Sequence, residues 1–142
     1  MRKLFHLLLA IVFLALIASA DASTVQVVVS GQVVFAIDYK QSVMEERGYQ
    51  FVGEGSYGRY VTNYFGAQDA DIVIKNAKED IVGVSKTKAD GTFTLKVDKS
   101  TFYHFTIEWR GKKIEKTISS LDAIKSIKFD LGHFETKQIP MD

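Results

Sequence analysis

From residue 25 onward the chain consists of short runs of alternating apolar and polar residues, separated by turn-forming residues about every ten positions. In residues 93–97, 103–109 and 127–131, every second residue is large and apolar. A repeat of two is typical of strands with one buried face. Because the sequence shows no long amphipathic helical pattern, it predicts an all-β fold, namely an antiparallel β-sandwich.

Turn residues between these runs suggest how the strands connect. The pair Asp90-Gly91 lies between two β-prone runs, residues 81–88 and 92–97. Asp-Gly is a strong signal for a hairpin turn because both central positions of such a turn need a positive φ. We therefore expect these two runs to pair with each other. Residues 25–37 and 71–75 predict two further strands.

The first twenty residues differ from the rest of the chain. Arg2 and Lys3 precede residues 4–20, which contain no Asp, Glu, Lys or Arg and end in Ala18-Ser19-Ala20. This pattern predicts a secretory signal peptide, residues 1–20, and an exported domain, residues 21–142, in the periplasm or at the cell surface. An uncleaved signal that anchors the protein in a membrane is the alternative, because the apolar run is just long enough to span one.

Charge and cysteine content exclude several classes of protein. Without residues 1–20, the basic residues fall from 18 to 16 against 17 acidic residues, so the net charge changes from +1 to −1. A nucleic-acid-binding protein usually has a clear basic excess, so no nucleic-acid partner is expected. The chain has no Cys, which excludes disulfides, thiolate zinc sites and a cysteine nucleophile.

One stretch of sequence resembles a known family. Residues 87–95 follow the pattern T-x-x-D-G-x-F-x-L, which is similar to the carboxypeptidase regulatory-like domains, a group of transthyretin-like (prealbumin-like) sandwiches. The similarity covers residues 25–37 and 70–131. The resemblance implies an accessory domain of the cell envelope that carries no catalytic residues. A Pro-rich link between the first two strands is usual in the family, and this chain has residues 38–69 there instead.

That insertion has an unusual composition. It contains five of the ten glycines and seven aromatic residues within 32 positions. A structureless loop of this length is improbable in a small domain. Ser42 and Glu45 have the spacing of a capping box, which predicts a helical turn that Gly48 ends. Residues 49–52 and 59–65 are expected to pair as a hairpin.

The same hairpin contains a literal G-x-G-x-x-G motif between Gly53 and Gly58. A dinucleotide site needs a helix after such a loop, whereas the following residues have a strand pattern. We therefore interpret the glycines as turn residues and expect no cofactor.

The aromatic residues of the insertion suggest a contact surface for a protein or glycan partner. Tyrosine and phenylalanine supply large contact areas at low side-chain entropy cost. The alternative is that they pack on the sandwich as ordinary core residues. The candidate binding residues are Tyr49, Phe51, Tyr57, Tyr60, Tyr64 and Phe65.

No candidate catalytic or metal site emerges from the remaining residues. His104 and His133 are the only histidines after residue 20, and no G-x-S-x-G motif accompanies them. Asp38, Asp69 and Asp71 lack the dense spacing of a calcium loop. We therefore expect a binding module that is not an enzyme and holds no metal.

A second hypothesis is a structural subunit that self-assembles into a filament or envelope complex. Residues 21–29 could add as a strand to the sheet of a neighbouring copy, giving a homo-oligomer. The sequence favours the alternative, in which they form the first strand of their own sheet, as their valine content and the placement of Gly31 suggest. Lys112, Lys113 and Lys116 indicate a solvated strand edge that discourages aggregation.

Overall fold

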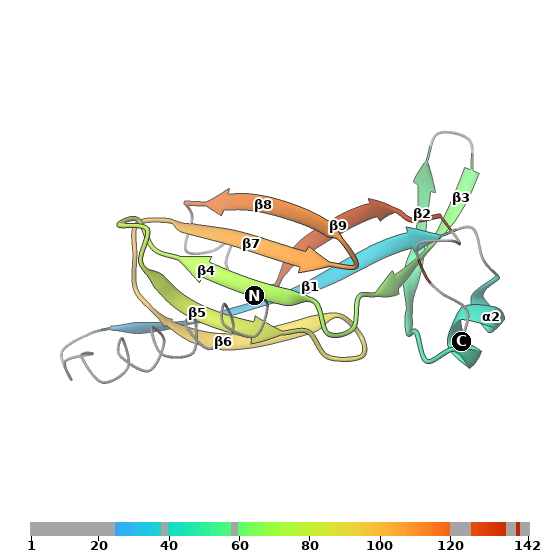
Figure 1. Ribbon diagram of the computed structural model, residues 1–142, viewed down its shortest axis with the longest axis horizontal. Coiled ribbons are helices and arrows are strands. Elements are labelled where there is room, and N and C mark those ends of the chain that lie inside the picture. Colours follow the sequence, from blue (N-terminus) through green and yellow to red (C-terminus); the bar gives the residue numbers. More distant parts are fainter. Residues whose placement is uncertain (1–24, 38–39, 58–59, 120–125, 136–138, 140–142) are drawn as a thin grey trace.

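The computed structural model describes residues 25–37, 40–57, 60–119, 126–135 and 139, without the side chains of residues 56–61. The predicted signal peptide lies outside these residues. Among the residues described, no helix is long and apolar enough to cross a membrane. The fold is an all-β sandwich of two sheets, as predicted (Figure 1). The first sheet contains β1 (Gln26–Ile37), β2 (Phe51–Tyr57), β3 (Tyr60–Gly66), β6 (Thr92–Asp98) and β9 (Ile127–His133); the second contains β4 (Asp71–Lys75), β5 (Ile81–Lys86), β7 (Tyr103–Trp109) and β8 (Lys112–Ile118).

The long strand β1 organises the first sheet. Its first half pairs antiparallel with β6 from Gln26 to Gln32, and its last residues pair antiparallel with β3. On its other edge β1 pairs with β9, and this pair is parallel. Alternation in a sequence does not encode the direction of a neighbour, so the parallel pair was not predictable from it. Gln26–Ile37 is thus a strand of its own sheet.

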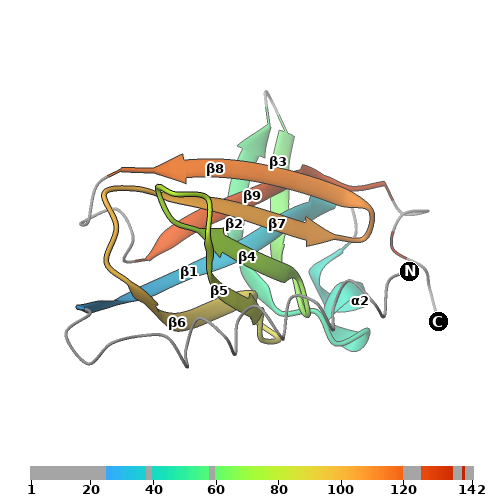
Figure 2. The ribbon, with the colours of Figure 1, turned by 60° about the vertical axis from the view of Figure 1, so that its left-hand side comes forward.

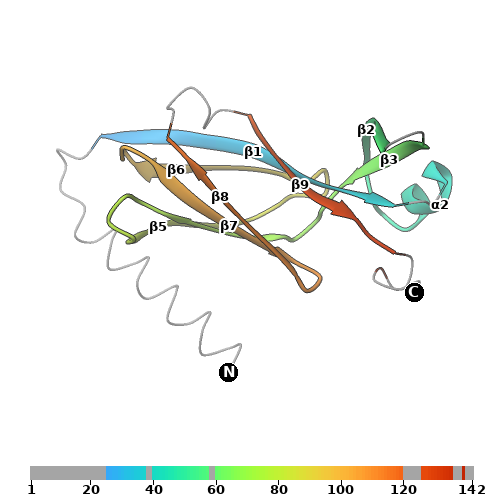
Figure 3. The same cartoon turned by 90° about the horizontal axis from the view of Figure 1, so that it is seen from above.

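The core lies between the two sheets, which are seen as separate layers in Figure 3. Along β7 the residues Tyr103, Phe105, Ile107 and Trp109 are buried, whereas the residues between them are not. Strand β9 repeats this pattern. The predicted alternation of both strands is therefore confirmed, and burial of these aromatic and branched side chains is the main force that holds the sheets together.

The turn at Asp90-Gly91 corrects one prediction. The turn exists, with φ +80° at Gly91 and a 2.9 Å hydrogen bond from its N–H to the Lys88 carbonyl. However, β5 pairs with β4 and β6 pairs with β1, so the predicted hairpin is wrong. The chain passes here from one sheet to the other. A turn signal specifies local dihedral angles, and the partner of each strand depends on distant residues.

Strand β8 is one of the two edge strands of the second sheet and lies beside β9 of the first. Lys112 Nζ lies 5.7 Å from the ring centroid of Phe134, and Lys116 Nζ lies 5.9 Å from that of Phe129. These lysines share the side of β8 that carries the buried Ile118, so they point towards the other sheet. Inward-pointing charges on an edge strand oppose pairing with another chain.

Candidate binding surface

The insertion has a folded structure of its own. It begins with the short helix α2 (Gln41–Glu46), whose Met44 is fully buried in the core. Gly48 ends the helix as predicted, with φ +90° and a hydrogen bond from its N–H to the Glu45 carbonyl. The predicted capping box is wrong, because Lys40 occupies the N-cap and no side chain caps the helix. Ser42 lies inside the helix instead.

Strands β2 and β3 form the predicted hairpin, which is longer than expected. The pairing extends from Phe51 opposite Phe65 to Tyr57 opposite Tyr60. Gly53 and Gly55 of the G-x-G-x-x-G motif therefore lie in a strand, with a shift in register between Phe51 and Gly53. The interpretation of these two glycines as turn residues is therefore wrong. Gly55 is needed because a Cβ there would lie 2.2 Å from the Tyr64 ring.

Three of the candidate aromatic residues pack at the base of this hairpin. Phe65 is fully buried, and its ring centroid lies 6.0 Å from that of Phe35 in β1. Phe51 contacts Phe65 edge-on at 5.9 Å, and Tyr49 contacts Phe35 edge-on at 5.6 Å. Edge-to-face contacts of this kind add stability beyond the buried area. These three residues therefore anchor the hairpin to the sandwich.

Arg110 joins the base of the hairpin to the β7–β8 turn. Its Nη2 donates a 2.7 Å hydrogen bond to the Tyr49 hydroxyl, and its guanidinium lies 5.1 Å from the Trp109 ring centroid. Sequence patterns predict only a turn at Arg110, and φ angles of +46° and +79° at Arg110 and Gly111 confirm that turn. The contact with Tyr49 joins positions 61 residues apart, so no local pattern could reveal it.

Tyr64 holds the other side of the hairpin. Lys128 Nζ of β9 lies 5.7 Å from the Tyr64 ring centroid. Partial burial, the nearby Asp130 carboxylate and a hydrogen bond with it raise the pKa of the Tyr64 hydroxyl. Because Tyr64 is in β3 and both partners are in β9, these contacts reach across β1 and fix the hairpin against the first sheet.

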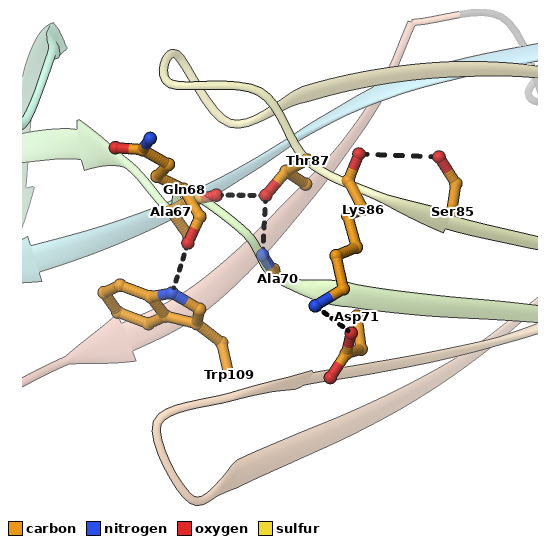
Figure 4. A network of polar contacts seen from close by, with 8 residues as sticks. All are labelled: Ala67, Gln68, Ala70, Asp71, Ser85, Lys86, Thr87 and Trp109. Atoms are coloured by element: carbon orange, nitrogen blue, oxygen red, sulfur yellow. Dashed lines mark hydrogen bonds and ion pairs between the residues drawn. The ribbon is translucent and has the colours of Figure 1, made fainter. Parts of the chain in front are cut away.

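A network of polar contacts anchors the chain where it leaves the hairpin (Figure 4). The Oγ1 of buried Thr87 accepts a 2.8 Å hydrogen bond from the Ala70 N–H and donates one to the Ala67 carbonyl. Trp109 Nε1 donates a 2.8 Å hydrogen bond to the Gln68 carbonyl. Residues 67–70 are thereby tied to Thr87, which follows β5, and to Trp109 in β7.

Tyr57 and Tyr60 are placed differently from the other four candidates. They are opposite each other at the far end of the hairpin, next to residues 58–59. Figures 1 and 2 show that this end points away from the other strands of the sandwich. The structure thus divides the six candidates into four residues with partners inside the molecule and two at the projecting end.

The two histidines lie in different sheets. His104 Nδ1 is 2.9 Å from the Thr117 hydroxyl and His104 Nε2 is 4.0 Å from Glu115, on the solvent face of the second sheet. His133 is exposed at the end of β9. Asp71 forms a 3.5 Å ion pair with Lys86. Within the described part of the chain, no three His, Asp or Glu residues are grouped so that they could hold a metal ion.

The fold and the candidate surface define a β-sandwich domain with a projecting hairpin whose base packs on the core. No protein-family model matches the chain, and no curated protein matches it.

Proposed function

We propose that the protein is an exported, non-enzymatic β-sandwich module that binds a protein or glycan partner in the cell envelope through the β2–β3 hairpin. One observation carries the proposal: the hairpin projects from the sandwich while Tyr49, Phe51 and Phe65 fix its base. Binding residues are often carried on segments that a rigid scaffold positions.

The base of the hairpin is held in place by the core contacts of Tyr49, Phe51 and Phe65. Binding then costs less conformational entropy than the ordering of a flexible loop would. Tyr57 and Tyr60 are neighbours across the hairpin, and tyrosine is enriched at the centres of interfaces. In this proposal these two residues contact the partner, whereas the other four candidates position the hairpin.

The cellular location and the family form part of the same proposal. The basic start at Arg2 and Lys3, followed by the uncharged run to Ala20, supports export. The resemblance of residues 87–95 to transthyretin-like domains supports an accessory role without chemistry of its own.

A double variant, Tyr57→Ser with Tyr60→Ser, tests the proposal. Immobilised protein comprising residues 21–142 is exposed to solubilised cell-envelope proteins, with captured proteins identified by mass spectrometry, and separately to a glycan array. We expect the double variant to lose about tenfold or more of the binding of whichever partner the unmodified protein captures.

Phe102→Ser is the matched control, because Phe102 is an exposed aromatic residue outside the hairpin, with 37% of its surface accessible. Circular dichroism establishes that all variants are folded. Equal capture by the double variant and the unmodified protein would refute the proposed role of the hairpin.

A further inference from the structure

The edges of the two sheets differ in how they are protected against another strand. On one side of the sandwich, Lys112 and Lys116 of β8 lie over the Phe134 and Phe129 rings. On the other side, β6 is an edge of the first sheet and carries the exposed Lys96 in its middle. Lysines of this kind are a common means of preventing edge-to-edge association.

Strand β2 is another edge of the first sheet and carries no such lysine. It pairs only with β3 among the described residues. Two of its residues are glycines, Gly53 and Gly55, and it contains no Lys, Arg or Pro. The backbone of another chain could therefore approach this edge without meeting a bulky side chain at those two positions.

The register shows which backbone groups of β2 face outward. The Gly66 N–H donates a 2.9 Å hydrogen bond to the Gln50 carbonyl, so the backbone carbonyl of Gln50 points towards β3. In an antiparallel pair the residues alternate between facing their partner and facing away. With the register shift at Gly53 taken into account, the backbone N–H and C=O groups that point away from β3 belong to Phe51, Glu54 and Ser56. We refer to these three residues as the β2 edge.

Glu54 gives the β2 edge a charge. It is exposed, lies opposite the neutral Asn63, and forms no ion pair within the described part of the chain. It is also the one charged residue of β2. A strand added at this edge would be favoured if it placed a lysine or arginine beside Glu54, because opposite charges on neighbouring strands stabilise the pair.

We propose that the β2 edge binds an extended peptide segment of a protein partner, which adds as a further strand and places a basic residue beside Glu54. This inference rests on the proposed binding function and narrows the partner from a protein or glycan to a protein. The unpaired N–H and C=O groups would supply affinity, and the side chain beside Glu54 would supply selectivity.

Three synthetic peptides test the proposal. The first is a soluble eight-residue peptide of β-branched residues with a lysine at its centre. The second has glutamate in place of that lysine, and the third is the lysine peptide with alternate backbone nitrogens methylated. We expect the lysine peptide to shift the amide NMR signals of Phe51, Glu54 and Ser56 and to bind about threefold to fivefold more tightly than the glutamate peptide. The methylated peptide lacks the necessary donors and should not bind.

Two variants separate the backbone contribution from the charge. Glu54→Pro removes an outward N–H without breaking a hydrogen bond to β3, and proline is tolerated at strand edges. This variant should bind the lysine peptide about tenfold more weakly than the unmodified protein does. Glu54→Lys keeps the N–H and should reverse the preference in favour of the glutamate peptide, which provides a readout that does not depend on the fold of the proline variant.

Specific outcomes would overturn the proposal. These are the absence of amide shifts in the β2 edge with all peptides, equal binding of the methylated peptide, or an unchanged peptide preference in Glu54→Lys. Any of these outcomes could occur while the double variant Tyr57→Ser with Tyr60→Ser still loses partner capture. In that case the hairpin binds its partner by another mode, and the proposed function stands without strand addition. If strand addition is observed but the tyrosine variant captures normally, the role of the tyrosines is refuted instead.

Discussion

Arg110 and Tyr49 are joined by a 2.7 Å hydrogen bond that links the β7–β8 turn to the segment between α2 and β2. The same tyrosine ring packs edge-on against Phe35 in the core. One side chain therefore connects the insertion both to the buried interior and to the opposite sheet. The orientation of the hairpin base depends on this connection.

Tyr49→Phe keeps the ring contact but removes the hydroxyl. We expect it to lower the free energy of unfolding by about 0.5–1.5 kcal/mol, since that is the usual net value of one hydrogen bond. Urea denaturation measures the change. In a double-mutant cycle with Arg110→Ala, the two losses should be less than additive, and strict additivity would mean that the hydrogen bond contributes nothing.

Gly91 and Gly111 have nearly equal positive φ angles but different surroundings. Alanine variants of the two therefore separate the cost of backbone strain from the cost of steric contact. Gly91→Ala and Gly111→Ala each force a side chain into positive φ, at +80° and +79°. A Cβ at Gly91 would lie 2.1 Å from the Val33 carbonyl oxygen, whereas nothing lies within 4 Å at Gly111. We expect a loss of about 1 kcal/mol for Gly111→Ala and a clearly larger loss for Gly91→Ala. Equal thermal unfolding of the two variants would contradict the close approach of this turn to β1.

Thr87→Val replaces a buried hydroxyl by a methyl group of similar size. The Ala70 N–H and the Ala67 carbonyl would each lose a hydrogen bond in a buried place. We expect a loss of stability of about 2–6 kcal/mol, since each of the two unsatisfied buried groups costs about 1–3 kcal/mol. Ser85→Ala is the control, because the Ser85 hydroxyl makes a long, exposed 3.4 Å contact and its removal should change little. Similar losses of stability in Thr87→Val and Ser85→Ala would show that the network in Figure 4 does not stabilise the segment that follows the hairpin.

Acid should weaken the Asp90 turn. The Thr92 hydroxyl and the Thr92 N–H donate hydrogen bonds to the Asp90 carboxylate, at 2.6 Å and 3.0 Å, and lower its pKa below the ordinary 3.8. A carboxyl group with a lowered pKa stabilises the fold above its ordinary pKa and ceases to do so as the pH falls through the folded value. We therefore expect stability to fall below about pH 4.

Asp90→Asn removes the titrating group from this turn. The part of the acid sensitivity that Asp90 contributes should be absent from the variant when stability is measured by denaturation across pH 2–6. A pH profile identical to that of the unmodified protein would contradict the assignment to Asp90.

The features that could be predicted from the sequence are those set by neighbouring residues. The alternation of β7 and β9 reflects a local period, and Gly48 ends α2 because its own backbone has a positive φ. The features that could not be predicted depend on residues far apart in the chain. Asp90 and Gly91 turn the chain as expected, but the pairing of β6 with β1 is decided by contacts across the core.

The same distinction applies to the candidate binding residues. Aromatic content marked the insertion as unusual, but it could not separate Phe65, which is fully buried, from Tyr57 and Tyr60 at the projecting end. That separation depends on Phe35 and Arg110, which lie in other segments. Glu54 was not among the candidates, because only the pairing pattern shows that its backbone faces outward.

The parallel pairing of β1 with β9 has a consequence for how the chain reaches its fold. Ribosomes release a chain from its N-terminus, so β1 emerges first and β9 emerges last. The first sheet can be completed only after the whole domain has been released, and each long loop that must close before then slows folding. Until that moment the valine-rich β1 has an unpaired edge, and a chaperone that covers it would be expected to increase the yield of folded protein.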